Sequence, residues 1–278
     1  MFQRHLLIFL FCLGACLSTR GQGDPLPGIG ARVAGMGNAF VAVKGNVWSL
    51  FHNPAAITGG TGLDVGAYFE QRFFLPELTF GNAGALYSLN ENQAIGLSLG
   101  SNGFSGYREN TAGLSYGITV LDKISIGATA NLATVSVPTY GTATTFFINF
   151  GAHFEISEQL SVGTSIYNTN RSNFETALGS REFFPTVITA GLAYYPTDQV
   201  LLVFDVQKDI DHPVSFKGGI EYALNEVLYA RLGVSTAPLL LSGGIGLNYK
   251  TFKFDFAISY TEFLQYTPHV SVNYAFGQ

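Results

Sequence analysis

Six charged residues stand in strand-like segments of the second half of the chain, on faces that otherwise carry small side chains. They are Asp205, Lys217, Glu221, Arg231, Lys253 and Asp255. Carboxylates and bases gathered in one enclosed space could line a polar path for a substrate. They could also pair as a structural network that fills and stiffens a barrel. The structural network is the commoner outcome, so we expect these side chains to hold the fold together.

Patterns for catalysis or metal binding are weak in this sequence. The five His are scattered, without an H-E-x-x-H motif or other ligand spacing. No serine lies in a nucleophile-elbow motif. The stretch "FDVQKDIDHP" at 204–213 could form a weak cation site, although a solvated loop end is the more frequent outcome. We therefore expect a protein that is not an enzyme, without catalytic residues, metal or cofactor.

The composition points to an environment other than water. Only 12% of the residues are charged, while 47% are hydrophobic and 14% aromatic. A soluble protein with so few charges would tend to aggregate, so lipid is expected to cover part of the surface. The net charge of -5 argues against a nucleic-acid partner, which would require clustered Lys and Arg.

Residues 1–21 have the layout of an export signal peptide. A short basic start around Arg4 precedes an apolar run from 6 to about 15, which is too short to span a bilayer as a helix. Cleavage after Gly21 would leave Gln22 as the new N-terminus. The sequence "LGAC" ending at Cys16 also matches a lipobox, so lipidation at Cys16 stays open. Ordinary cleavage would leave a mature chain without cysteine, because Cys12 and Cys16 both precede Gln22.

After residue 60, apolar and polar residues alternate with a period of two, which is typical of strands with two different faces. In "TFKFDFAISY" one face carries Phe252, Phe254, Phe256, Ile258 and Tyr260. The other face carries Lys253, Asp255, Ala257 and Ser259. Counting such segments predicts fourteen strands, at 63–74, 77–89, 93–106, 108–120, 123–135, 143–156, 159–170, 185–196, 199–209, 213–224, 227–235, 238–249, 251–263 and 266–277.

These strands predict an all-β fold, a 14-stranded antiparallel transmembrane β-barrel at residues 61–278. Tight polar turns alternate with looser connections such as 136–142 and 171–184, as in outer-membrane barrels whose strands need about 9 to 11 residues to cross. A soluble β-sandwich is the alternative. It would expose a well-charged face, whereas the polar faces here are mostly Gly, Ala, Ser, Thr and Asn. Barrel closure also satisfies every backbone group, as a bilayer demands.

The last strand, "PHVSVNYAFGQ", nearly ends on an aromatic residue, with Tyr274 and Phe276 on its outward face. This ending resembles the C-terminal signal by which outer-membrane barrels are recognised for insertion, although Gly277 and Gln278 follow. We expect Tyr274 and Phe276 to serve as that signal. The implied partners are outer-membrane lipids and the outer-membrane assembly machinery.

The segment at 22–60 precedes the barrel and contains "GIGARVAGMGNAFVAVKGNVWSLFHNPAAITGG". It resembles the N-terminal signature of the FadL-like barrels, in particular the PorV/PorQ branch associated with type IX secretion. That signature, G-A-R-x-A-G-M-G-x-A-F-V-A-V followed by a short helix and N-P-A, is matched at 30–43 and 53–55. The chain departs from it at 44–46 and at His52. The plug and N-P-A residues singled out are Arg32, Gly35, Gly37, Asn53, Pro54 and Ala55.

The 22–60 segment is expected to be an inward plug near the periplasmic end of the barrel. Its Gly and Ala residues allow close packing against the wall. Pro54 would end a short helix at 47–52, and Asn53 would hydrogen-bond local backbone. A periplasmic tail with a helix stop is the alternative.

Two functions remain open for a protein of the Gram-negative outer membrane. The PorV/PorQ resemblance implies a non-enzymatic interaction or accessory protein in outer-membrane protein secretion or assembly, which binds secretion-system proteins. The alternative is a FadL-like channel for uptake of hydrophobic small molecules such as long-chain fatty acids, by way of a plug shift and a gap in the wall. The short loops leave little extracellular structure to collect a ligand, so the sequence favours the first.

Overall fold

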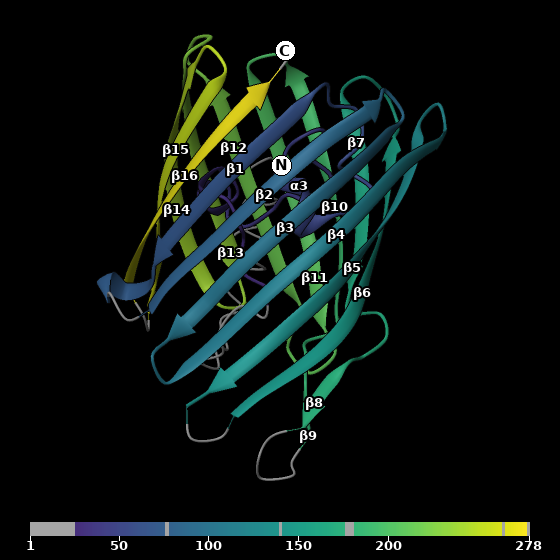
Figure 1. Cartoon of the computed structure of the whole chain (residues 1–278). Helices are drawn as coiled ribbons and strands as arrows, with labels where there is room; N and C mark the ends of the chain where they lie inside the picture. The colour runs from purple at the N-terminus through teal and green to yellow at the C-terminus, as the bar shows by residue number, and fades with distance from the viewer. Residues whose placement is uncertain (1–25, 76–77, 139–140, 176–180, 263–264, 277–278) are drawn as a thin grey trace, which may run out of the picture.

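A computed structural model describes residues 26–75, 78–138, 141–175, 181–262 and 265–276. The predicted signal peptide and Cys16 lie outside these residues. The chain forms a closed antiparallel barrel in which sequence neighbours pair and the first strand, β1, also pairs with the last, β16 (Figure 1). Leu63 at the start of β1 lies opposite Phe276 at the end of β16.

The barrel strands are tilted and mostly nine or more residues long (Figure 1). Their bounds are β1 Leu63–Gln71, β2 Thr79–Asn90, β3 Gln93–Phe104, β4 Tyr107–Leu121, β5 Ile124–Val137, β6 Gly141–Glu155, β7 Leu160–Tyr167, β10 Val187–Thr197, β11 Val200–Asp209, β12 Ser215–Ala223, β13 Leu228–Thr236, β14 Leu239–Tyr249, β15 Phe252–Thr261 and β16 Gln265–Phe276.

The predicted fold class is confirmed, because the closed sheet contains fourteen strands. The structure adds a separate two-stranded sheet, β8 Asn173–Glu175 with β9 Arg181–Phe183, within the connection predicted as a loose loop. These strands are three residues long, too short for a period of two to be recognised in the sequence. A 3-10 turn, η1 Arg72–Phe74, follows β1.

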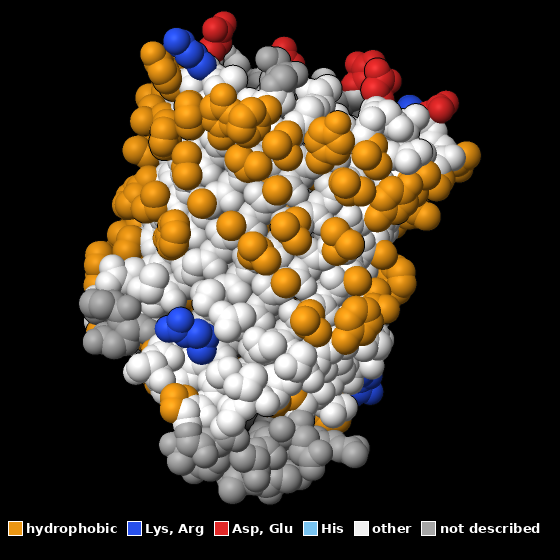
Figure 2. Space-filling view, viewed as in Figure 1, with side chains coloured by type: hydrophobic (Ala, Val, Ile, Leu, Met, Phe, Trp, Pro, Cys, Tyr) orange, Lys and Arg blue, Asp and Glu red, His pale blue; other side chains and the backbone are white. Residues whose placement is uncertain are grey.

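The outward face of the barrel is apolar, as the alternation predicts. Phe69, Leu114, Phe254 and many similar side chains are exposed, and they form a broad hydrophobic band around the side of the barrel seen in Figure 2. Contact between water and so large an apolar surface is unfavourable, and soluble monomers rarely expose one of this extent. Among the described residues, no helix is long and apolar enough to cross a bilayer.

The two ends of the barrel differ, and we call them the turn end and the loop end. At the turn end, uppermost in Figure 1, short connections such as 91–92 and 122–123 join the strands, and the chain ends there with β16. At the loop end several connections are longer, up to the 168–186 segment that contains β8 and β9.

Residues 26–60 lie within the barrel and are mostly buried. This segment, which we call the plug, contains the helices α2 Ala31–Gly35 and α3 Ser49–His52. The helix predicted at 47–52 is thus shorter by two residues at its start, and Asn53 follows it as the C-cap before Pro54. The side chains of the plug, among them Met36, Phe40 and Trp48, supply most of the hydrophobic core.

Candidate functional site

The plug fits because many of the wall positions that it touches are glycines, which have no side chain. At nine wall positions, a Cβ added to the native glycine would come closer than 3.0 Å to a plug atom. These glycines are Gly66, Gly84, Gly96, Gly117, Gly127, Gly151, Gly163, Gly219 and Gly233. Real Cβ atoms essentially never approach so closely, so this glycine belt is a seat shaped for the plug backbone and its short side chains.

Hydrogen bonds fasten the plug to the seam where β1 meets β16. The Trp48 indole donates to Asn273 Oδ1 at 3.0 Å, and the Ala31 amide donates to Ser271 Oγ at 3.3 Å. On the other side of the seam, the Val47 amide donates to Asp64 at 3.1 Å. The plug therefore bridges the first and last strands of the barrel.

The N-P-A residues join the plug to β6. The Asn53 amide group donates to the Val41 carbonyl at 2.8 Å within the plug and to the Ala152 carbonyl of β6 at 3.1 Å. Its carbonyl accepts from the Ala55 amide at 3.0 Å. Asn53 thus makes the local backbone contacts expected of it, together with a contact to the wall.

Five of the six predicted charges lie in two clusters that both hold the plug. In the first, Arg32 of α2 pairs with Glu221 at 2.7 Å, and Arg231 pairs with Glu221 at 2.6 Å and with Asp255 at 2.7 Å. Burial lowers the pKa of Arg32, but the Glu221 carboxylate more than offsets this and holds that pKa above its ordinary value. Arg32 is therefore a fixed cation that ties the plug to the wall.

The second cluster contains Asp205, whose carboxylate accepts from the Phe40 and Val41 amides of the plug at 2.7 and 3.0 Å. Lys217 lies directly opposite Asp205 in the register of β11 and β12. The remaining predicted charge, Lys253, is half-buried on β15. It takes part in none of the ion pairs found among the described residues. Within the same residues, no group of His, Cys, Asp and Glu could hold a metal ion.

A cavity of about 500 Å³ lies between the plug and the loop end of the barrel. Its floor is the plug, with Ile29, Val41 and Phe51 among the lining residues. The volume falls within the range of about 300–1,000 Å³ that is usual for small-molecule sites. The cavity is therefore large enough for a ligand of one or two rings.

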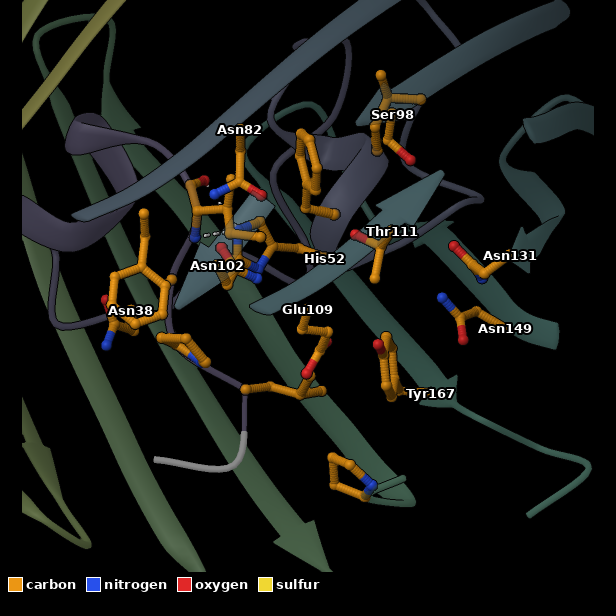
Figure 3. Close-up of a pocket in the computed structure, with 18 of the residues that line it drawn as sticks. Asn38, His52, Asn82, Ser98, Asn102, Glu109, Thr111, Asn131, Asn149 and Tyr167 are labelled. Atoms are coloured by element: carbon orange, nitrogen blue, oxygen red, sulfur yellow. Dashed lines mark hydrogen bonds between the residues drawn. The ribbon is translucent and has the colours of Figure 1, made fainter. Parts of the chain in front are cut away.

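Uncharged hydrogen-bonding side chains from consecutive strands surround this cavity. This polar belt consists of Asn82 of β2, Ser98 of β3, Thr111 of β4, Asn131 of β5, Asn149 of β6, Ser165 of β7, Thr189 of β10 and Gln207 of β11. Figure 3 shows Asn131 and Asn149 side by side above the ring of Tyr167, with Thr111 and Glu109 beside the same space. Carboxamides and hydroxyls both donate and accept, so the belt can match varied polar groups.

Aromatic side chains also line the cavity nearer the loop end. Phe147 packs on Tyr167 and Phe184 with ring centroids 4.9 and 5.6 Å apart. Phe104 and Tyr107 line it from the connection between β3 and β4. A ligand in the cavity would thus meet rings on one side and hydrogen-bonding groups on the other.

One buried polar cluster borders the cavity next to η1. The Tyr68 hydroxyl donates to Glu70 at 2.6 Å, and His269 Nδ1 lies 2.8 Å from the same hydroxyl. Arg72 pairs with Glu70 at 2.6 Å and stacks over the Phe80 ring at 3.8 Å. The cation of this cluster is therefore already engaged by a protein carboxylate.

A second hollow, of about 420 Å³, lies in the wall where β1 to β5 face outward. Outward side chains such as Phe69 and Leu99 line it together with the inward Asn82 and Thr111, which also line the cavity. Gly100 stands between these two, since a Cβ there would lie 2.7 Å from Asn82 Oδ1 and 2.7 Å from Thr111 Oγ1. At Gly100 the cavity and the lipid-facing hollow are separated by little more than backbone.

Neither the cavity nor the hollow was found from the sequence. The alternation marks Asn82, Asn131 and Asn149 as inward, but the relative height of residues on different strands depends on register. Register brings the polar belt to one level and the glycines to another. The run of inward Asn, Ser and Thr on successive strands is the sequence signal that could have indicated the cavity.

Comparison with known proteins connects this fold to solved channels. No protein-family model matches the sequence, and no curated protein matches it. Among solved structures, the chain is similar to the CymD monoaromatic hydrocarbon channel, with a TM-score of 0.72 and 14% identity over 92% of this chain and 100% of that one. It is also similar to the Ralstonia pickettii toluene transporter TbuX, with a TM-score of 0.70 and 15% identity over 90% and 99% of the two chains.

A Pseudomonas aeruginosa FadL homologue is similar too, with a TM-score of 0.66 and 12% identity over 92% of this chain and 100% of that one. The chain therefore has the fold of FadL-like outer-membrane barrels. The expected PorV/PorQ branch is not supported. The prediction of an accessory role in protein secretion is wrong, since the similar structures include a monoaromatic hydrocarbon channel and a toluene transporter.

Proposed function

We propose that the protein is an outer-membrane channel for the uptake of hydrophobic small molecules. The observation that carries the proposal is the cavity of about 500 Å³ on the loop-end side of a seated plug. The fold shared with solved hydrocarbon channels is consistent with it. The apolar band on the outer face suits a lipid bilayer, and the predicted signal at 1–21 suits export.

In this proposal a molecule enters from the loop end, rests in the cavity and leaves sideways into the lipid. The plug blocks the straight path, because its core residues Met36, Phe40 and Trp48 are fully buried against the wall. The sideways path is supported by Asn82 and Thr111, which line both the cavity and the wall hollow on either side of Gly100.

The test is uptake of labelled toluene by a Gram-negative host that lacks channels of this kind. Expression of the protein should raise the initial rate severalfold above that of the empty host. Asn131→Phe, which fills the cavity, should remove this gain. Ala130→Phe is the matched control, since Ala130 is the preceding residue of β5 and faces outward. Its uptake should equal that of the unchanged protein.

Equal uptake by Asn131→Phe and the unchanged protein would show that the cavity is not on the path. No gain from the unchanged protein with toluene, naphthalene or a long-chain fatty acid would remove the channel proposal. Membrane fractionation and heat-modifiable gel mobility establish that each variant has inserted as a folded barrel.

A further inference from the structure

The cavity differs from a plain hydrocarbon site in the number of hydrogen-bonding groups around it. Eight uncharged polar side chains form the polar belt, contributed by β2 to β7, β10 and β11. Some of these groups already hydrogen-bond within the barrel, as Asn131 does with the Phe147 carbonyl at 3.5 Å. A pure hydrocarbon at this level would remove water from the donors and acceptors that remain, without replacing their hydrogen bonds. Each buried donor or acceptor left unpaired costs about 1–3 kcal/mol. The belt therefore favours a ligand that carries its own polar group.

One lining residue already presents an unsatisfied acceptor. The Oδ1 atom of Asn102 is buried and has no hydrogen-bond partner among the described residues. Figure 3 shows Asn102 at the cavity together with Asn82 and His52. A hydroxyl or amide N–H on a bound molecule would satisfy such an acceptor.

The charges around the cavity disfavour an anion. The lining contains three carboxylates, Glu70, Glu109 and Asp205, against two cations, Arg72 and Lys217. Arg72 is paired with Glu70 at 2.6 Å, and Lys217 lies opposite Asp205 in the strand register. A ligand carboxylate would have to compete with a protein carboxylate for either cation. Without such a partner, a buried charge is strongly unfavourable.

We propose that the cavity binds a neutral aromatic molecule bearing hydroxyl or amide groups, in preference to a plain hydrocarbon or a carboxylate. This rests on the proposed function as a small-molecule channel. The ring packs against Phe147, Tyr167 and Phe184, while its polar substituent reaches Asn102 and the belt residues Asn82 and Asn131.

The test uses three probes that share one ring system, namely naphthalene, 2-naphthol and 2-naphthoate. Binding to the purified full-length protein is measured by equilibrium dialysis at pH 7, with the same detergent in both chambers so that partition into micelles cancels. We expect 2-naphthol to bind at least about fivefold more tightly than naphthalene, the ratio that one net hydrogen bond provides. We expect 2-naphthoate to bind at least about tenfold more weakly than 2-naphthol.

Removal of the amides should abolish the preference without abolishing binding. In the variant Asn82→Leu with Asn131→Leu, the ratio of 2-naphthol to naphthalene affinity should fall toward one. The matched control is Asn248→Leu on β14, because Asn248 does not belong to the cavity lining. Its ratio should equal that of the unchanged protein. A partly misfolded preparation lowers the capacity for both probes equally, so the ratio still reports on the cavity, and each single variant is measured as well.

Naphthalene binding as tightly as 2-naphthol, or 2-naphthoate binding most tightly, would overturn the inference while leaving the channel proposal in place. An unchanged ratio in the double variant would overturn the role of the belt. Failure of all three probes to bind saturably to the unchanged protein would instead count against the channel proposal itself.

Discussion

The Arg231 guanidinium of β13 reaches the Asp255 carboxylate of β15 at 2.7 Å by crossing β14, the strand between them. Gly246 of β14 leaves room for this crossing, because a Cβ there would lie 2.5 Å from Arg231 Nη2 and 2.7 Å from Asp255 Oδ1. Arg231 also binds Glu221, which in turn binds Arg32 of the plug. One chain of alternating charges thus links the plug to the wall.

This chain of charges predicts a measurable coupling between Arg32 and Glu221. Glu221→Gln leaves the buried Arg231 and the half-buried Arg32 with one carboxylate fewer, so the barrel should lose about 3–5 kcal/mol of unfolding free energy. Arg32→Met should lower the unfolding free energy less in the Glu221→Gln background than in the unchanged protein. Urea unfolding followed by the fluorescence of Trp48, the single tryptophan, gives the double-mutant cycle.

The matched control for that cycle is the pair formed by Lys44 and Glu155, in which the glutamate side chain is 39% exposed, against 8% for Glu221. Substituting either residue should change stability by about 0–1 kcal/mol. Strict additivity of Arg32→Met and Glu221→Gln would mean that the plug is not held by this charge chain.

Gly37 and Gly35 are expected to differ in how they tolerate a methyl group. Gly37 has φ +67° and a Cβ there would lie 2.5 Å from the backbone nitrogen of Val234. Gly35 has room, with Arg231 Cβ at 3.4 Å. Gly37→Ala should therefore displace the plug, because the strained backbone alone costs about 1–3 kcal/mol of stability. Gly35→Ala should leave the plug in place.

Planar-bilayer recording distinguishes these two variants. The unchanged protein and Gly35→Ala should pass little or no ion current, while Gly37→Ala should show open-channel steps. Porin-like conductance of the unchanged protein would contradict the idea of a closed plug.

Gly100→Val is expected to separate binding from transport. The added side chain would press on Asn82 and Thr111 and fill the thin wall between the cavity and the lipid-facing hollow. Uptake of labelled toluene should fall severalfold, whereas dialysis of naphthalene, which needs no hydrogen bond from Asn82, should give an affinity within about twofold of the unchanged protein. Ala130→Val serves as the control for added bulk on the lipid face. Full uptake by Gly100→Val would exclude a sideways exit at this position.

Phe276→Asp is expected to lower the amount of inserted barrel. Phe276 is 48% exposed on the outward face of β16, and its ring lies 4.2 Å from that of Tyr274. A carboxylate there would face lipid and remove the terminal aromatic that we predict assembly to read. Phe276→Tyr keeps the ring and should insert normally. The measurement is the heat-modifiable fraction in isolated outer membranes, and an unchanged fraction for Phe276→Asp would argue against the signal.

The sequence predicts much of the barrel because a period of two is a local property. Phe252, Phe254 and Phe256 identify an outward face without any knowledge of the neighbouring strand. Strand number follows from repeating that observation, which is why fourteen strands could be counted. The boundaries agree to within a few residues, except around the short β8 and β9.

The site could not be predicted in the same way, because it depends on contacts between residues far apart in the chain. Arg32 and Glu221 are 189 residues apart, and Trp48 and Asn273 are 225 apart. Local pattern marks such residues as inward but does not choose their partners. The predicted secretion role is wrong for a related reason. Short loops leave little extracellular structure to collect a ligand, but the cavity lies inside the barrel wall, where only long-range contacts reveal it.

The bridge that the plug makes across β1 and β16 has a consequence for the order of events during biogenesis. Trp48 and Ala31 find their partners, Asn273 and Ser271, on β16, the strand of the barrel that is synthesised last. The plug, which precedes the barrel in the chain, can therefore make these bonds only after β16 has been synthesised. A polypeptide that stops before β16 would lack the strand that closes the barrel. It would also lack the residues that hydrogen-bond to the plug. Completeness of the chain is thereby a condition for a closed pore.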